Sequence, residues 1–425
     1  MEGRISLRVF LASAAIAAMT MFTGSAQNPD APAGYNTPVT HDASQIQGNG
    51  MILSANETLA DDMDTFMEED DISEGLGPVY NARGCVDCHA NPVVGGTSIV
   101  TELRVGHRDL HGNFVNPTIT INDGATQIPG RSLINDRAVC AEAQETVPSS
   151  EYIRALRATT SILGDGFVEA IDDTTLLAIA INQAKATGGR IAGQAILVPV
   201  MEAPGQTRVG RFGWKDQQAS LLSFAGDAYV NEQGITNRLF SANSTTACGS
   251  TEGVEDKTDP ATGLQDIDKF ASFMRSTRVP PRDSVLAGTP DAQQGAQLFH
   301  AIGCDTCHVS SITTAPAGTK INGGAFVVPD ALGSKVIHPY SDFLLHNVGT
   351  GDGIVQNGPQ NTANKLRTPP LWGLRTKSRL MHDLLSGTRN EAILRHGGEA
   401  TFVINNYRFL TGQQKNALVA FLNSL

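Results

Sequence analysis

Two five-residue motifs constrain this chain more than any other feature. They are Cys85-Val86-Asp87-Cys88-His89 and Cys304-Asp305-Thr306-Cys307-His308. The C-x-x-C-H pattern is typical of c-type haem attachment, in which both cysteine sulfurs bond one porphyrin and the adjacent histidine is the proximal iron ligand. A C-x-x-C pair alone would equally suit a thiol redox pair or half of a zinc site. The histidine that follows both pairs favours two covalently bound haem c groups, with His89 and His308 as iron ligands.

The N-terminus has the features of a secretory signal. Arg4 and Arg8 precede an apolar stretch at residues 9–22 that is too short to span a bilayer, and small residues follow at 24–26. We expect cleavage after Ala26 and export to the periplasm, which leaves a mature chain without a membrane span. An uncleaved anchor is the alternative. Export agrees with the two motifs, because bacterial c-type haem attachment takes place outside the inner membrane.

Charge and cysteine count narrow the class of protein further. The net charge of −12 gives no electrostatic support for nucleic-acid binding. Four of the six cysteines belong to the haem motifs, so Cys140 and Cys248 remain. In an oxidising compartment such a pair usually forms a disulfide, whereas two separate thiols or a working redox pair are the alternatives.

The predicted fold is mostly α-helical, with two cytochrome-c-like haem domains and loop-rich insertions. After the signal peptide (1–26), residues 27–285 are assigned to the first domain and 286–425 to the second. Helices are predicted at 149–184 with interruptions, at 266–276, from a cap at Thr289 and from a capping box at Thr411. The last two would cross beside the second haem, where Gly295 would allow a close approach. Residues 91–131 are rich in glycine and predict loops and short strands.

The same order of motifs follows both haem sites, which indicates an internal repeat. An arginine motif comes first, and two further motifs follow in the same order, with an extra stretch at residues 169–209 between the first two motifs of the first half. In the first half these positions hold Arg157, Trp214 and Glu232, and in the second half they hold Arg367, His382 and His396. If the halves are duplicated domains, Trp214 and His382 are counterparts, and so are Glu232 and His396.

This order of motifs resembles the bacterial di-haem cytochrome c peroxidase superfamily. It is most similar to the branch of di-haem oxidoreductases, whose members are often labelled as peroxidases or thiol oxidoreductases. The similar segments span nearly all of the mature chain: 76–81, 95–97, 210–215, 339–346, 367–374 and 396–400.

The resemblance implies a role for several residues. In the peroxidases one haem is six-coordinate and transfers electrons, and the other has an open distal face where peroxide binds. Glu232 would then be the acid–base group over the first haem, and Trp214 would lie between the haems. His396 occupies the distal position of the second haem, and we expect it to bind that iron. His382 would hydrogen-bond a propionate or a ligand.

The distal ligand of the first haem stays open at this point. His107 or His111 would reach that iron, or the position would be free for a substrate. A carboxyl group in an apolar haem pocket should have a raised pKa, which suits proton transfer to and from peroxide. An open distal position therefore favours an enzyme, and an occupied one favours an electron carrier.

The expected function is a periplasmic di-haem oxidoreductase of the peroxidase type. A small cytochrome or cupredoxin would donate electrons at the second haem, and hydrogen peroxide or another small oxidant would be reduced at the first. The alternatives are a non-enzymatic di-haem electron carrier, and an accessory redox partner that acts on a protein or thiol or serves metal uptake. The resemblance allows a homodimer, since peroxidases of this superfamily are often dimers with calcium, but no ligand cluster in the sequence compels a calcium ion.

Overall fold

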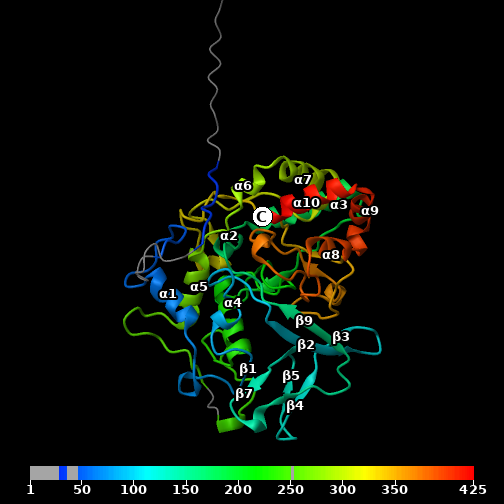
Figure 1. Cartoon of the computed structure of the whole chain (residues 1–425). Helices are drawn as coiled ribbons and strands as arrows, with labels where there is room; N and C mark the ends of the chain where they lie inside the picture. The colour runs from blue at the N-terminus through cyan, green and yellow to red at the C-terminus, as the bar shows by residue number, and fades with distance from the viewer. Residues whose placement is uncertain (1–27, 36–45, 250–252) are drawn as a thin grey trace, which may run out of the picture.

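The computed structural model describes residues 28–35, 46–249 and 253–425 (Figure 1). The predicted signal peptide and its cleavage site after Ala26 lie outside these residues. Among the residues described, every helix is too short or too polar to cross a bilayer.

The helices are short and are distributed along the whole described chain. They are α1 (Leu59–Met67), α2 (Asp165–Glu169), α3 (Asp173–Thr187), α4 (Leu221–Ala228), α5 (Asp266–Ser276), α6 (Ser284–Ala287), α7 (Pro290–Ala301), α8 (Arg389–Leu394), α9 (Thr401–Phe409) and α10 (Gly412–Asn423).

The strands are short as well, and nearly half of them lie between the first haem motif and α2. They are β1 (Val79–Tyr80), β2 (Thr101–Arg108), β3 (Phe114–Val115), β4 (Thr118–Ile121), β5 (Gln127–Pro129), β6 (Leu133–Ile134), β7 (Arg137–Ala138), β8 (Glu145–Thr146), β9 (Ile153–Ala158), β10 (Leu197–Pro199), β11 (Thr207–Val209), β12 (Ile312–Thr313), β13 (Lys320–Ile321), β14 (Phe326–Val327), β15 (Val336–Ile337), β16 (Leu345–His346) and β17 (Leu366–Arg367).

The prediction of a mostly α-helical fold is wrong, because 32% of the chain is helical and 16% lies in strands. In the largest sheet β2 pairs with β3, β6 and β9, and a second sheet has the order β5-β4-β8. These strands lie together at the lower end of Figure 1. The pairing of β2 with β9 is antiparallel and runs from Thr101 opposite Ala158 to Gly106 opposite Ile153. Hydrogen bonds to β2 therefore hold residues 153–158 extended, where the sequence predicted a helix.

The predicted crossing of two helices beside the second haem motif is confirmed. The Thr289 side chain accepts from the Ala292 amide and starts α7, and Thr411 forms a capping box at the start of α10. The two helices pack against each other. Gly295 lies at the crossing, where an added Cβ would come within 2.0 Å of the Ala417 carbonyl oxygen. Only glycine therefore allows these backbones to approach so closely.

The first haem motif packs against α1 and α5. Phe66 of α1 lies with its ring centroid 6.0 Å from His89 and 4.9 Å from Phe273 of α5. Helix α5 covers 266–276 as predicted. The predicted disulfide between Cys140 and Cys248 is also present, with the two Cα atoms 5.8 Å apart. This part of the chain is therefore held by an aromatic core and one covalent cross-link.

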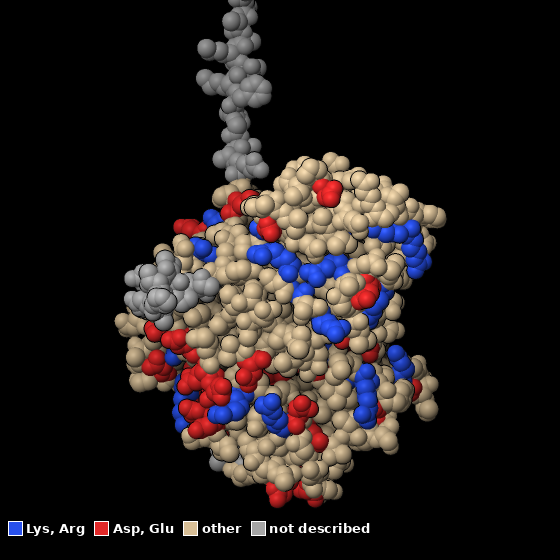
Figure 2. Space-filling model, viewed as in Figure 1, with Lys and Arg blue, Asp and Glu red and all other residues tan. Residues whose placement is uncertain are grey.

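Charge is distributed unevenly over the face shown in Figure 2. Basic side chains gather over the part that contains α8 and α10, and acidic side chains gather over the part nearest α1. Because α7 and α10 flank the second haem motif, the surface near that motif is the more basic part of this face.

Replacing Gly295 with alanine tests the helix crossing. The added methyl group would meet backbone that cannot move aside freely, so the free energy of unfolding should fall by about 1–3 kcal/mol. Chemical denaturation of the holoprotein, followed by circular dichroism, would measure it. Gly412→Ala is the matched control, because an added Cβ there meets nothing within 4 Å. Equal stability of the two variants would show that the helices do not cross at Gly295.

Candidate di-haem site

Both attachment motifs lie on tight helical turns, each at the wall of a large cavity. In the first, η2 (Cys85–Asp87), the His89 amide donates to the Cys85 carbonyl at 3.0 Å. In the second, η6 (Cys304–Thr306), the His308 amide donates to the Cys304 carbonyl at 3.0 Å. The first cavity encloses about 1260 Å³ and the second about 1520 Å³, counting the space open to solvent. All six residues of the two attachment sets line these cavities.

Both proximal histidines are prepared to bind a metal through Nε2. Nδ1 of His89 donates to the Gly96 carbonyl at 3.3 Å, and Nδ1 of His308 donates to the Tyr340 carbonyl at 2.9 Å. Burial lowers the pKa of both histidines to about 4, so each ring is neutral at pH 7. A neutral imidazole whose Nδ1 proton is held by a carbonyl presents its Nε2 lone pair, which is the usual arrangement of metal-bound histidine.

His396 shares the second cavity with His308. It follows α8, and its Nδ1 donates to the Ala392 carbonyl at 2.9 Å. Burial lowers the pKa of His396, and its side chain lines the cavity. The residues present therefore suit an iron with a histidine on each side.

The second cavity also contains donors that have no protein partner. Nε of Arg389 and Nδ1 of His382 are buried without a hydrogen bond, although both residues line the cavity. Lys377 lines it too, and burial followed by repulsion from Arg367 lowers the pKa of Lys377 to about 8. Unpaired buried donors are rare, and a carboxylate would satisfy them with charge-assisted hydrogen bonds. A haem, which carries two propionates, fits this set of residues.

Glu232 stands at the wall of the first cavity on a single π-helical turn, η4 (Tyr229–Gln233). Its Oε2 accepts a hydrogen bond of 2.7 Å from the Asn81 amide group. Loss of hydration raises the pKa of Glu232 to about 7, and the charge of Glu102 adds to that shift. π-Helical turns occur often at functional sites. The group is therefore able to exchange a proton near neutral pH.

Trp214 lines both cavities, which places it between the two predicted haem sites. Its Nε1 donates to the Ala158 carbonyl at 2.8 Å, and its own carbonyl accepts from the Arg367 amide at 2.9 Å. The ring of His382 packs edge-on against it, with centroids 6.0 Å apart. The sequence paired these two residues as counterparts of a repeat, and the structure brings them into contact.

His107 and His111 lie away from both cavities. His107, on β2, pairs with Glu151 at 2.8 Å, and His111 is exposed between β2 and β3. Among the described residues that line the first cavity, His89 is the only histidine. Met274 lines it as well, but within the same apolar core as Phe66. The structure therefore favours the open alternative for the distal side over either loop histidine.

Sequence reasoning gave no role to Asp352, although it pairs with Arg157, which lines the first cavity, and with Lys215, which directly follows Trp214. It accepts from Arg157 Nε at 2.8 Å and lies 3.2 Å from Lys215 Nζ, and all three side chains are 1% exposed. Burial opposes ionisation of Asp352, but the two cations outweigh it and lower its pKa. The segment that carries Asp352 had no motif that would single out this residue.

Sequence reasoning also missed Glu102, an acidic residue that lines the first cavity together with Glu232. The sequence placed it in a stretch that predicted loops and short strands, so nothing indicated that it would face Glu232. The one available signal was the spacing of Glu102 and Arg104. They are two residues apart, which puts both side chains on one face of a strand once β2 is known.

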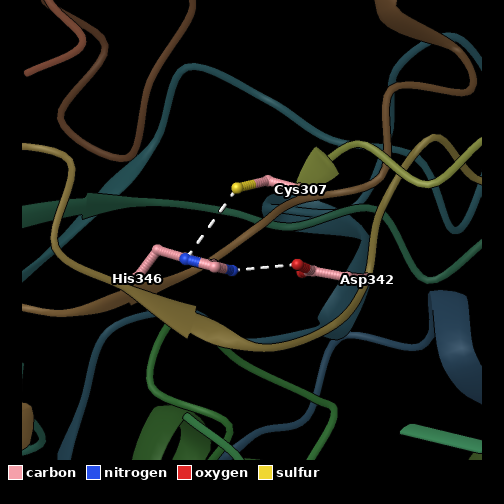
Figure 3. A group of neighbouring side chains, drawn as sticks. All are labelled: Cys307, Asp342 and His346. Carbon is pink, nitrogen blue, oxygen red and sulfur yellow. Dashed lines mark hydrogen bonds and ion pairs between the residues drawn. The ribbon is translucent and has the colours of Figure 1, made fainter. Parts of the chain in front are cut away.

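Cys307, Asp342 and His346 form a compact group at the second motif (Figure 3). Their potential ligand atoms all lie within 4.8 Å of one another. His346 donates to Asp342 at 2.9 Å and to Glu399 at 3.0 Å, and the Cys307 sulfur is 3.8 Å from its Nδ1. Burial disfavours the imidazolium, but Asp342 and these hydrogen bonds prevail and raise the pKa of His346 well above its usual value. The protonated ring pairs with the carboxylates of Asp342 and Glu399, which places an ion cluster beside the attachment turn.

Asp352→Asn tests the ion cluster between the cavities. Two buried cations would lose their anion, which should lower the free energy of unfolding by about 3–5 kcal/mol. Because the pKa of Asp352 is depressed, its contribution is full above the pKa of the unfolded carboxyl and is lost as pH falls through the folded value. Denaturation at several pH values would measure both effects. Glu69→Gln, at the exposed pair with Arg83, is the control and should cost about 1 kcal/mol or less. Equal losses in both variants would contradict the assignment.

Comparison with known proteins gives the family. Residues 138–425 match the family described as "Di-haem oxidoreductase, putative peroxidase". No curated protein matches the chain. Hydrazine synthase of Kuenenia stuttgartiensis is 12% identical, with 99% of this chain and 100% of that chain covered and a TM-score of 0.38. A MauG-like protein associated with microbial copper homeostasis is 21% identical, with 40% and 55% covered and a TM-score of 0.26. The family match covers most of the chain, and the protein therefore belongs to the di-haem oxidoreductases, a family whose name implies haem cofactors.

Proposed function

We propose that the protein is a periplasmic c-type oxidoreductase that reduces hydrogen peroxide or another small oxidant at the first haem site. The observation that carries the proposal is the difference between the two cavities. The first combines one histidine with a carboxyl group of raised pKa, whereas the second holds a histidine pair, His308 and His396. Two bound haems would supply redox-active irons, one to accept electrons from a small cytochrome or cupredoxin and one to deliver them to the oxidant.

Glu232 is suited to move the proton that peroxide reduction requires. Its carboxylate form accepts a proton from the oxygen of peroxide nearer the iron and returns it to the far oxygen, which leaves as water. A pKa near the working pH makes both transfers feasible. Asn81 holds the carboxyl group in place during this exchange.

The second site is suited to accept and pass on electrons rather than to bind a substrate. His308 and His396 line the same cavity and would be the residues that hold an iron there. Histidine pairs give lower potentials than histidine with methionine. Trp214 borders this cavity and the first one, and its backbone is fixed by Arg367. Its position supports a role as the relay between the sites.

Covalent attachment is tested by removing cysteines in pairs. Cys85→Ala with Cys88→Ala should leave one tethered haem per chain, and so should Cys304→Ala with Cys307→Ala. The pyridine haemochrome spectrum and haem staining after denaturing electrophoresis measure this content. Cys140→Ser with Cys248→Ser is the matched control and should keep two. Haem that is extracted from the wild-type chain by acidified solvent would contradict the c-type assignment.

Glu232→Gln should reduce peroxide turnover by about 10²–10⁴-fold while haem content stays unchanged, because the amide cannot exchange the proton. Steady-state assays with a reduced small cytochrome would measure turnover. Glu151→Gln is the control, since Glu151 lies outside both cavities and pairs with His107. Unaltered turnover in Glu232→Gln would reject the acid–base role.

A further inference from the structure

The first cavity contains two carboxyl groups that come from different parts of the chain. Glu232 stands on η4, and Glu102 stands on β2, in the sheet that follows the first haem motif. Both line the cavity together with Cys88 and His89. The two carboxyl groups share a hydrogen bond, so one proton lies between them when only one is ionised.

The sheet fixes Glu102 in its ionised form. Glu102 and Arg104 are two residues apart on β2 and therefore point to the same face. Arg104 binds both oxygens of Glu102, through Nε at 2.8 Å and through Nη2 at 2.9 Å. Arg157 lies opposite Glu102 in the β2–β9 pairing and approaches it at 3.9 Å, although its main partner is Asp352. A paired, planar contact of this kind is among the stronger charge-assisted interactions in proteins.

Glu232 has no comparable cation. Its direct hydrogen-bond donor is the neutral amide of Asn81. The charged groups that act on it from the surrounding elements are Glu102 and Arg104 of β2, Arg131 before β6, and, through Arg104, Asp227 of α4. The two carboxyl groups thus sit in unlike surroundings, and such pairs divide into one acid and one fixed anion.

We propose that Glu102 is a positioning residue of the first site: it stays ionised and, through the shared hydrogen bond, holds the Glu232 carboxyl group toward the cavity. This inference rests on the proposed function, because it assigns the acid–base work to Glu232. Glu102 accepts the hydrogen bond from the protonated Glu232 and so orients the carboxyl group that faces the cavity. Its charge raises the pKa of Glu232, whereas Arg104 lowers the pKa of Glu102 despite its burial.

The proposal predicts how the protonation of Glu232 responds to changes at Glu102. In the holoprotein, the infrared carbonyl band of a protonated carboxyl group would be followed against pH and assigned by its loss in Glu232→Gln. The midpoint should lie near 7 in the wild type. In Glu102→Gln it should fall by about 1 pH unit or more, because the like charge is gone. The acid limb of peroxide reduction should move with it, since the carboxylate form is the base.

Two further variants test whether the charge of Glu102, rather than a change in structure, sets the titration midpoint of Glu232. Glu102→Asp keeps the negative charge and should leave the midpoint close to the wild-type value. Arg104→Gln removes the cation and should move the midpoint upward, which still tests the proposal if Glu102→Gln does not fold. An unchanged midpoint in both Glu102→Gln and Arg104→Gln would overturn it. If Glu232→Gln keeps full peroxide turnover while the band shifts in Glu102→Gln, the proposed function fails and the carboxyl pair stands.

Discussion

The arrangement of the two cavities depends on a buried ion cluster in which Asp352 binds Arg157 and Lys215. Arg157 comes from β9, and Lys215 directly follows Trp214, so the cluster ties the sheet to the loop that carries the tryptophan. Lys215 also donates to the carbonyls of residues 362, 363 and 365. Removing one charged partner would leave the others without compensation inside the protein. This cluster therefore helps to hold Trp214 in its position at the wall of both cavities.

The two cavities also differ in how their charged side chains are paired. In the second cavity, cations such as Lys377 lack protein anions, and the histidines are neutral because burial disfavours their protonated forms. In the first cavity, Arg104 is engaged by Glu102 and Arg157 by Asp352, and the direct hydrogen-bond donor of Glu232 is the neutral amide of Asn81. One site is thus prepared to receive an anionic cofactor edge, and the other is prepared to hold a mobile proton.

Local signals in the sequence predicted what local physics determines. The helix caps at Thr289 and Thr411 and helix α5 follow from short-range patterns. The close approach at Gly295 and the Cys140–Cys248 pair join distant segments, and they were indicated by a glycine in a predicted helix and by the cysteine count. The domain boundary at 285 stays a prediction.

The predictions that failed concerned contacts between segments that are distant in the chain. Residues 153–158 have no strong strand signal alone and become extended only because β2, about fifty residues earlier, supplies hydrogen bonds. Asp352 and Glu102 were missed for the same reason, since their importance lies in partners that are distant in the chain. Pairing across a sheet decides both the fold class and the neighbours of Glu232.

The disulfide between Cys140 and Cys248 sets two opposite demands on biogenesis. These two sulfurs are oxidised in the structure, whereas the covalent haem attachment that we propose would need the four sulfurs of the attachment motifs to stay as thiols until each porphyrin is joined. A C-x-x-C pair closes easily into its own disulfide in an oxidising compartment. Cys85 and Cys88 precede Cys140 in the chain, so an oxidant that meets the emerging polypeptide encounters the wrong pair first. Under the proposed function, assembly would therefore need a reductant and an oxidant that act on the same chain in a defined order.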